Sequence, residues 1–348
     1  MRGLLAQDRH EIVVLISERD DAPVVEPPHE LIRVSHPRQP FVAALNFDVH
    51  AEGLARVAAE RADLHAIIGN AQFHMPRPRH VPRIVVLYEA AFMEPTPWGV
   101  YSAYSYRQLL TLPRRNLAGA RGVVCLAEHG RQQISRWFDT PLDRIRIAPP
   151  SLEPFGDWIG PPPMDGRPYV LQVGWFHPRK EVTLALAGWR DAVERGLDVD
   201  LVLAGTEGPP DRRHGSMGRR ILETVGADLV SRVRFTGSVP RAELGAYYRG
   251  ASAVLMTSIH EGFGIPAIEA ASVGVPVVAV CRASLPEVVG PIGAVVEPEP
   301  AAIGDALLHA CTTTRDVAAL KRYAASFSVE RQVAPFLELA DRIEAKVA

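Results

Sequence analysis

The chain has 348 residues, of which 47% are hydrophobic and 22% charged, which is typical of a soluble globular protein with room for two domains. Its formal net charge of −2 argues against a nucleic-acid-binding protein, and no apolar run reaches the ~20 residues of a membrane helix. Three widely spaced cysteines, Cys125, Cys281 and Cys311, fit neither a zinc site nor a disulfide framework. We therefore expect a cytoplasmic protein without a metal site.

The first half alternates short apolar strands with helical segments, which predicts a parallel, doubly wound α/β sheet. Strands are predicted at residues 11–16, 31–34, 64–68, 84–88, 122–126 and 144–148, and helices at 41–60, 101–117 and 128–138. Residues 1–150 are the first predicted domain. Segment 74–83 of this domain is basic and contains several prolines. It is either a solvated loop, which we favour, or a binding site for an anionic lipid-linked acceptor. The second case implies peripheral contact with the inner face of the membrane.

Seven prolines in residues 149–168 mark a semi-rigid linker, which we place at 151–168. Strands follow at 169–173, 201–204, 233–237, 254–256, 275–280 and 293–296, and helices at 182–195, 241–250, 265–273, 301–312, 317–326 and 329–347. Residues 169–326 are the second predicted domain. Residues 327–348 are expected to be a helix that crosses back to the first domain.

Residues 254–287 form the most informative segment, a buried strand followed by a glycine loop, a helix and a second strand. Gly262 and Gly264 let backbone N–H groups approach a ligand, and the positive end of the helix suits an anion such as a diphosphate. Glu261 and Glu269 bracket this unit. Two carboxylates that face one pocket suit the hydroxyl groups of sugars.

The sequence Ser258-Ile-His-Glu-Gly-Phe-Gly-Ile-Pro-Ala-Ile-Glu-Ala resembles the donor-site signature of family 4 glycosyltransferases, which are retaining enzymes with the GT-B fold. The later motifs Gly274-Val-Pro-Val-Val and Ser284-Leu-Pro-Glu-Val-Val-Gly strengthen the resemblance. It implies two Rossmann-like domains that face a cleft. It also implies transfer of a hexose, with mannose as an example, from a GDP- or UDP-linked donor without a metal or cofactor. The acceptor would be a glycan, a lipid-linked or a small molecule, as in polysaccharide biosynthesis.

The resemblance also implies roles for individual residues. It places Glu261 near the donor sugar and Glu269 on the ribose hydroxyls. The implied donor-binding residues are Gly174, Val239, Gly262, Phe263, Gly264, Ile265 and Glu269.

Arg179 and Lys180 follow the strand at 169–173 and match a Pro-Arg-Lys variant of the family pattern. Lys180 is one of only three lysines among 38 basic residues, and a compact ammonium suits a phosphate-directed point charge. We expect Lys180 to lie at the start of the helix at 182–195, where the helix dipole repels a cation unless a diphosphate binds. Removing its charge should then leave the unliganded fold intact or slightly more stable. The predicted catalytic residues are Arg179, Lys180 and Glu261.

The N-terminal half matches the family only loosely. No glycine-rich loop precedes residues 11–16, so either the first β-α unit is missing or the start codon was assigned late. Tyr88 and Glu89 end a strand where family members have a His followed by an acid, which makes these two residues acceptor-side candidates.

Two other functions remain open. Residues 262–267 also match the G-x-G-x-x-A dinucleotide fingerprint, and Arg282 could read a 2′-phosphate, so an NADP-dependent oxidoreductase is one alternative. A non-catalytic sugar-nucleotide-binding subunit is the other. Asp198 and Asp200 form a D-x-D sequence, but we expect them to end a turn before a strand rather than to bind a metal.

Overall fold

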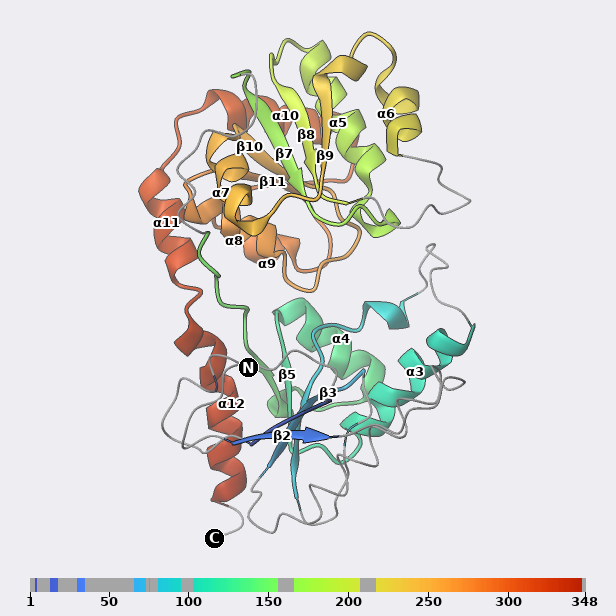
Figure 1. The fold of residues 1–348 in the computed structure, drawn as a ribbon, viewed down its shortest axis with the longest axis vertical. Coiled ribbons are helices and arrows are strands. Elements are labelled where there is room, and N and C mark those ends of the chain that lie inside the picture. The colour runs from blue at the N-terminus through green and yellow to red at the C-terminus, as the bar shows by residue number, and fades with distance from the viewer. Residues whose placement is uncertain are drawn as a thin grey trace. The chain divides into compact units, whose positions relative to one another are not determined.

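The computed structural model describes residues 4, 13–17, 30–34, 66–72, 75, 81–94, 103–155, 166–206 and 217–345. The chain divides into two compact units (Figure 1): unit 1 is Met1–Pro149 with Val329–Ala348, and unit 2 is Pro150–Ser328. Both units contain parallel β-sheet covered by helices, which confirms the α/β fold class. The predicted helix at 41–60 and most of the basic segment 74–83 lie outside the described residues.

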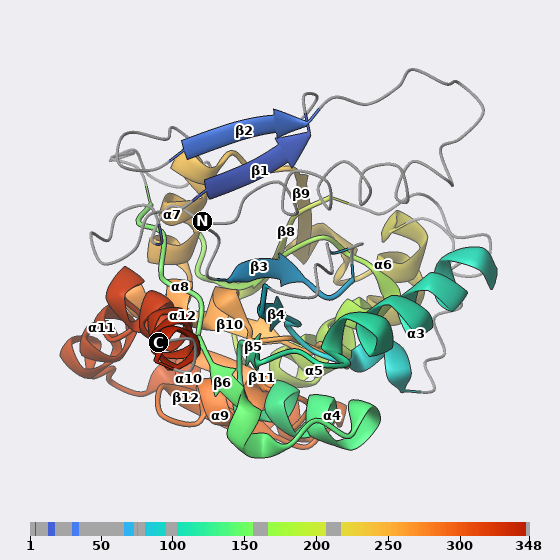
Figure 2. The ribbon, with the colours of Figure 1, turned by 90° about the horizontal axis from the view of Figure 1, so that it is seen from below.

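Unit 1 contains two parallel sheets in its described part. One sheet consists of β1 (Val13–Ser17) and β2 (Glu30–Val34), which lie side by side in Figure 2 and pair only with each other among the described strands. The other sheet consists, in spatial order, of β3 (Ile67–Asn70), β4 (Arg83–Val86), β5 (Gly122–Cys125) and β6 (Ile145–Ile147).

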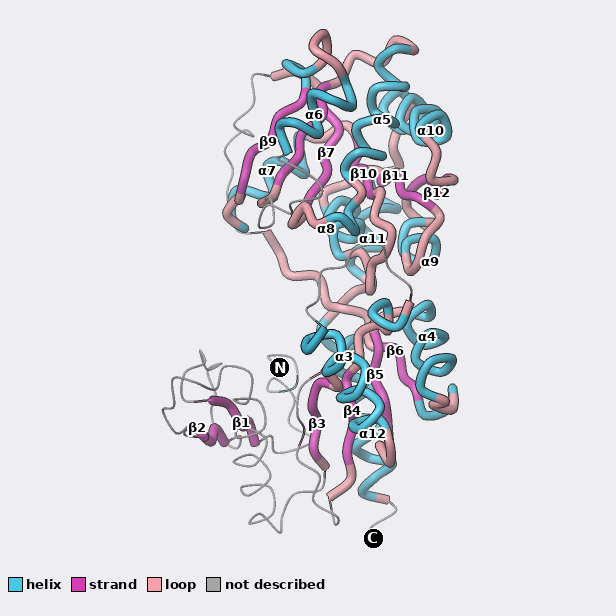
Figure 3. Tube along the Cα trace, turned by 90° about the vertical axis from the view of Figure 1, so that its right-hand side faces the viewer, coloured by secondary structure: helices cyan, strands magenta, loops and turns pink. Residues whose placement is uncertain are grey.

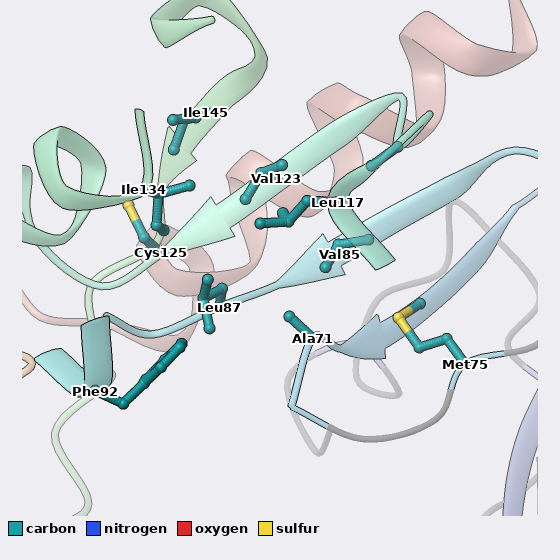
Figure 4. Packing of buried hydrophobic residues seen from close by; sticks show 11 residues of the cluster. Ala71, Met75, Val85, Leu87, Phe92, Leu117, Val123, Cys125, Ile134 and Ile145 are labelled. Carbon is teal, nitrogen blue, oxygen red and sulfur yellow. The ribbon is translucent and has the colours of Figure 1, made fainter. Parts of the chain in front are cut away.

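Helices pack on both faces of the four-stranded sheet. These helices are α3 (Ala103–Leu117), α4 (Glu128–Phe138) and α12 (Val329–Glu344). Neighbouring strand residues point to opposite faces, so Val123 joins the core that contains Leu117 and Ile134 (Figure 4), whereas Val124 joins the core that contains Leu339. The second core therefore needs α12, from the far end of the chain.

Unit 2 is built on a six-stranded parallel sheet. Its strands are β7 (Tyr169–Val173), β8 (Asp200–Ala204), β9 (Val233–Gly237), β10 (Ala253–Met256), β11 (Val277–Val280) and β12 (Gly293–Val296). The spatial order is β12-β11-β10-β7-β8-β9, so the direction of winding reverses between β7 and β10. Ligands of such sheets bind outside the carboxyl ends of the strands at this switch point.

The helices of unit 2 bury the sheet between them. They are α5 (Val182–Glu194), α6 (Met217–Val225), α7 (Arg241–Gly250), α8 (Ile265–Ser272), α9 (Leu285–Val289), α10 (Pro300–Thr312) and α11 (Val317–Ala325). Helix α5 packs against α6 and α10, and α8 packs against α7 and α11 (Figures 1 and 3). Strands β10 and β11 are buried along their whole length, as expected of a parallel sheet covered on both faces. No helix in the described ranges is long and apolar enough to cross a membrane.

Candidate functional site

The loops that follow β7 and β10 meet at the switch point of unit 2. The first loop contains η3 (Pro178–Lys180), a short 3-10 helix, and the second comprises residues 257–264. The backbone N–H of Ile259 donates to the carbonyl of Arg179 at 2.8 Å, and Thr257 Oγ1 donates to the carbonyl of Lys180 at 3.0 Å. Gln172, inside β7, donates from Nε2 to the same Lys180 carbonyl at 3.3 Å. These bonds fix the two loops against each other.

The joined loops gather the three predicted catalytic residues into one charged cluster. Lys180 Nζ lies 2.5 Å from Glu261 Oε1, and Arg179 Nη1 lies 3.7 Å from Glu261 Oε2. Ser258 Oγ donates to Glu261 Oε1 at 2.7 Å. The side chains of Lys180 and Glu261 are each 9% exposed, whereas that of Arg179 is 35% exposed. Two cations and one carboxylate give the cluster a net positive charge, which suits an anionic ligand.

The surroundings of Glu261 keep its carboxyl group ionised. Burial acts to raise its pKa, but the charges of Lys180 and Arg179, with the hydrogen bonds from Lys180 and Ser258, outweigh burial and lower the pKa below its ordinary value. A carboxylate held in this way can accept hydrogen bonds from sugar hydroxyls but is poorly suited to give up a proton.

Lys180 lies directly before the predicted helix. It ends η3, and α5 begins at Val182, after Glu181 in the left-handed region with a φ of 45°. The ion pair with Glu261, which was not expected, explains why a lysine is buried here. Removing the Lys180 charge would leave a buried carboxylate with fewer partners, so the expectation of an unchanged or more stable fold is replaced by one of lower stability.

Two glycines allow a close approach of the loops after β7 and β8. Gly174 has a φ of 140°, and a Cβ there would lie 3.1 Å from Lys180 Cε. Gly205 has a φ of 157°, and a Cβ there would lie 1.7 Å from the carbonyl oxygen of Gly174. No other residue type fits at Gly205 without moving the β7 loop.

The glycine loop after β10 leads into α8, and hydrogen bonding by Ser284 fixes its backbone. The buried Ser284 Oγ lies 2.8 Å from the Glu261 carbonyl oxygen and 2.9 Å from that of Phe263. The Phe263 ring is buried and packs against Phe327 with centroids 5.5 Å apart, so the Phe263 side chain anchors the loop. Gly264 has a φ of 101° and precedes α8, whose first turn has no side-chain cap. Pro266 has no N–H, and the N–H of Ala267 donates to the Gly264 carbonyl at 2.9 Å, so the backbone N–H groups of Gly264 and Ile265 are the ones at this helix end that could meet an anion.

Glu269 lies on α8 in a second cluster. Tyr248 OH donates to Glu269 Oε2 at 2.7 Å, and Arg241 Nη1 donates to Glu269 Oε1. Burial raises the pKa of Tyr248 well above its ordinary value, and the Glu269 charge adds to this effect. Glu261 and Glu269 therefore have separate partners, although both are buried.

The remaining candidates are distributed over both units. Ile265 is 46% exposed at the start of α8, and Val239 is half-buried in the turn between β9 and α7. Tyr88, which is 49% exposed, and Glu89 belong to unit 1, where they follow β4.

Other polar residues that the sequence singled out have partners in the structure. Asp198 and Asp200 form ion pairs with Arg167 and Arg232, and Arg282 forms one with Glu181. Within the described part of the chain, no three His, Cys, Asp or Glu side chains gather as a metal site would require.

Several residues that organise the site were not predicted. Ser258 and Ser284 head two of the motifs quoted above, so their positions were visible although their roles were not. Gln172 carried a usable signal, because a polar residue inside the buried apolar strand β7 requires a hydrogen-bond partner. The sequence gives no signal for the roles of Arg241 and Tyr248, because these roles depend on contacts with Glu269, which is distant in the chain.

The strand order of unit 2, with its switch point between β7 and β10, is that of a Rossmann-like doubly wound domain. Residues 167–313, which are 147 of the 348 residues, match the family model "Glycosyl transferases group 1". O-antigen chain mannosyltransferase B of Escherichia coli is 31% identical over 201 residues, or 53% of this chain and 49% of the relative. The chain thus matches about half the length of this relative.

Solved structures show the fold of the chain. Sucrose-phosphate synthase from Thermosynechococcus elongatus superposes with a TM-score of 0.68 at 18% identity, over 97% of this chain and 90% of that one. Anabaena HepE, solved in complex with UDP and glucose, superposes with a TM-score of 0.60 at 16% identity, over 89% of this chain and 86% of that one. The predicted GT-B fold is confirmed.

Proposed function

We propose that the protein is a retaining glycosyltransferase that moves a hexose, with mannose as the first candidate, from a nucleotide-diphosphate sugar to an acceptor hydroxyl without a metal ion. The observation that carries this proposal is the buried cluster of Arg179, Lys180 and Glu261 in the loops that lead to α5 and α8. The family match and the mannosyltransferase relative support it. The UDP and glucose bound by Anabaena HepE support a nucleotide-sugar donor.

The cluster would act on the departing diphosphate. As the bond between the anomeric carbon and the diphosphate oxygen breaks, negative charge grows on the diphosphate and positive charge grows on the sugar. Arg179, Lys180 and the backbone N–H groups of Gly264 and Ile265 at the start of α8 would stabilise the first charge, because they are preorganised donors. Glu261, held ionised, would orient the sugar hydroxyls and stabilise the second.

Retention follows if the acceptor oxygen attacks from the side on which the diphosphate leaves. The acceptor proton then passes to a diphosphate oxygen, the new glycosidic bond forms, and no enzyme residue becomes a covalent nucleophile. We assign the acceptor, a glycan or a lipid-linked molecule, to unit 1 and keep Tyr88 and Glu89 as its candidate contacts.

Calorimetry and donor hydrolysis test this proposal on the full chain. We expect GDP or UDP to bind with a dissociation constant between micromolar and millimolar, about −8 to −4 kcal/mol, with no effect of EDTA. Proton NMR of slow donor hydrolysis should show the retained anomer of the sugar first. Tighter binding of NADP than of either diphosphate would favour the oxidoreductase. Diphosphate binding without any turnover would favour a non-catalytic subunit.

Lys180→Met separates catalysis from binding. An interaction that strengthens in the transition state affects turnover more than affinity, so we expect hydrolysis to fall by about a hundredfold or more while donor affinity changes much less. Lys321→Met is the matched control, because Lys321 is an exposed lysine on α11. Wild-type hydrolysis by Lys180→Met would contradict the catalytic assignment.

A further inference from the structure

The carboxylate of Glu269 is buried, yet among the residues that the structure describes each of its oxygens has one hydrogen-bond donor. Arg241 Nη1 donates to Oε1, and Tyr248 OH donates to Oε2 at 2.7 Å. An ionised carboxylate offers about two lone-pair positions on each oxygen. The two donors therefore fix the plane of the carboxylate while one acceptor position on each oxygen remains, which is the arrangement that a pair of neighbouring hydroxyls requires.

Arg241 is itself held at three points. Besides its bond to Glu269, its Nη2 donates to the carbonyl of Glu153, and its guanidinium lies over the ring of Phe155 with Cζ 4.7 Å from the centroid. A planar guanidinium that is stacked and bonded in two directions has little rotational freedom.

Phe155 also supports Tyr248. The two rings lie 5.2 Å apart at an angle of 39°, and the Tyr248 side chain is fully buried. Gly245, on the same helix, makes room for Phe155, because a Cβ at Gly245 would lie 2.8 Å from Phe155 Cβ. One aromatic ring at the start of unit 2 thus fixes both donors to Glu269.

We infer that Arg241 and Tyr248 are positioning residues that present the Glu269 carboxylate to the two ribose hydroxyls of the donor nucleotide, and that Phe155 holds them in place. This inference rests on the proposed function, since it deepens the nucleotide site of unit 2. The physical advantage is preorganisation: a carboxylate that is already oriented loses little freedom when it binds a diol.

The experiment compares two ligands on each variant: whichever of GDP and UDP binds the wild type, and its 2′,3′-dideoxy analogue. The ratio of the two dissociation constants reports the ribose hydroxyls alone, because any general loss of folding weakens both ligands equally. The wild type should prefer the ribose form by at least about tenfold, as charged hydrogen bonds predict. Tyr248→Phe, Arg241→Met and Phe155→Leu should each remove most of that preference and leave the affinity for the dideoxy form within about twofold.

Tyr247→Phe is the matched control, because it removes the hydroxyl of the adjacent tyrosine, which is not a partner of Glu269. It should keep the wild-type ratio. A wild-type ratio in Tyr248→Phe and Arg241→Met, or an equal loss for both ligands, would overturn the inference. Equal binding of the two ligands by the wild type would also overturn it while leaving the proposed function intact. Failure of both GDP and UDP to bind would instead refute the proposed function.

Discussion

Removing one partner of the pair formed by Lys180 and Glu261 should cost unit 2 several kcal/mol of stability. Both side chains are 9% exposed and the two charged atoms lie 2.5 Å apart. Removing one partner of a buried pair typically costs about 3–5 kcal/mol, because the other charge stays buried without compensation. After Lys180→Met, Ser258 still donates to Glu261, and Arg179 lies 3.7 Å from it but is 35% exposed. We therefore expect the low end of the range, about 3 kcal/mol.

Thermal unfolding followed by circular dichroism measures this cost, and the transition of unit 2 is the one that added nucleotide raises. For a unit of this size about 3 kcal/mol corresponds to a midpoint lowered by roughly 6–12 °C. The double variant Lys180→Met/Glu261→Gln should recover most of the loss, because it buries no charge at either position. Lys321→Met should stay within about 0.5 kcal/mol of the wild type. A wild-type midpoint for Lys180→Met, or no recovery in the double variant, would refute the argument.

Two further predictions concern the same site. Gly205→Ala should lower the free energy of unfolding in urea by clearly more than Gly196→Ala. At Gly196, which has a φ of 100°, a Cβ would meet no other atom, so only the backbone strain of about 1–2 kcal/mol applies. At Gly205 a Cβ would also collide with the Gly174 carbonyl oxygen. Equal losses would show that the β7 and β8 loops do not touch. Glu261 has a lower pKa in the folded protein than in the unfolded chain, so its ionised form stabilises the fold at pH values above the unfolded pKa of about 4.3. This stabilisation is lost as the pH falls through the folded pKa. Stability of unit 2 should therefore depend less steeply on acid pH in Glu261→Gln than in the wild type, and an unchanged slope would assign that dependence to other carboxylates.

The bounds of several elements could be predicted from the sequence because local signals defined them. The predicted and observed bounds agree for β7, β9, β12, α4 and α7. Strand β11 begins two residues later than predicted, at Val277, directly after Pro276, which lacks a backbone N–H group for the sheet. The predicted catalytic residues also meet in space, because parallel strands bring the loops at their carboxyl ends to one edge of the sheet.

What the sequence did not predict depends on contacts between distant positions. Lys180 and Glu261 are 81 residues apart, and the ion pair that buries Lys180 has no local signal. Helix α9 was not predicted, because its five residues have little intrinsic helical stability and depend on the burial of Leu285 and Val289. The partners of Glu269 are equally non-local, so the sequence indicated a carboxylate at this position but not how it is held.

The discontinuity of unit 1 has a consequence for the order in which the chain folds. The apolar face that contains Ile84 and Val124 is covered by Leu339 of α12, and Gly122 leaves the space for it, since a Cβ there would lie 2.6 Å from Leu339 Cδ2. Residues 150–328 are synthesised between the two parts of unit 1. At about 5–20 residues per second, the ribosome needs roughly 10–35 s to make them. Unit 2, whose chain is continuous, can therefore fold while the sheet of unit 1 still waits for its last helix, so the half that is translated first is completed second.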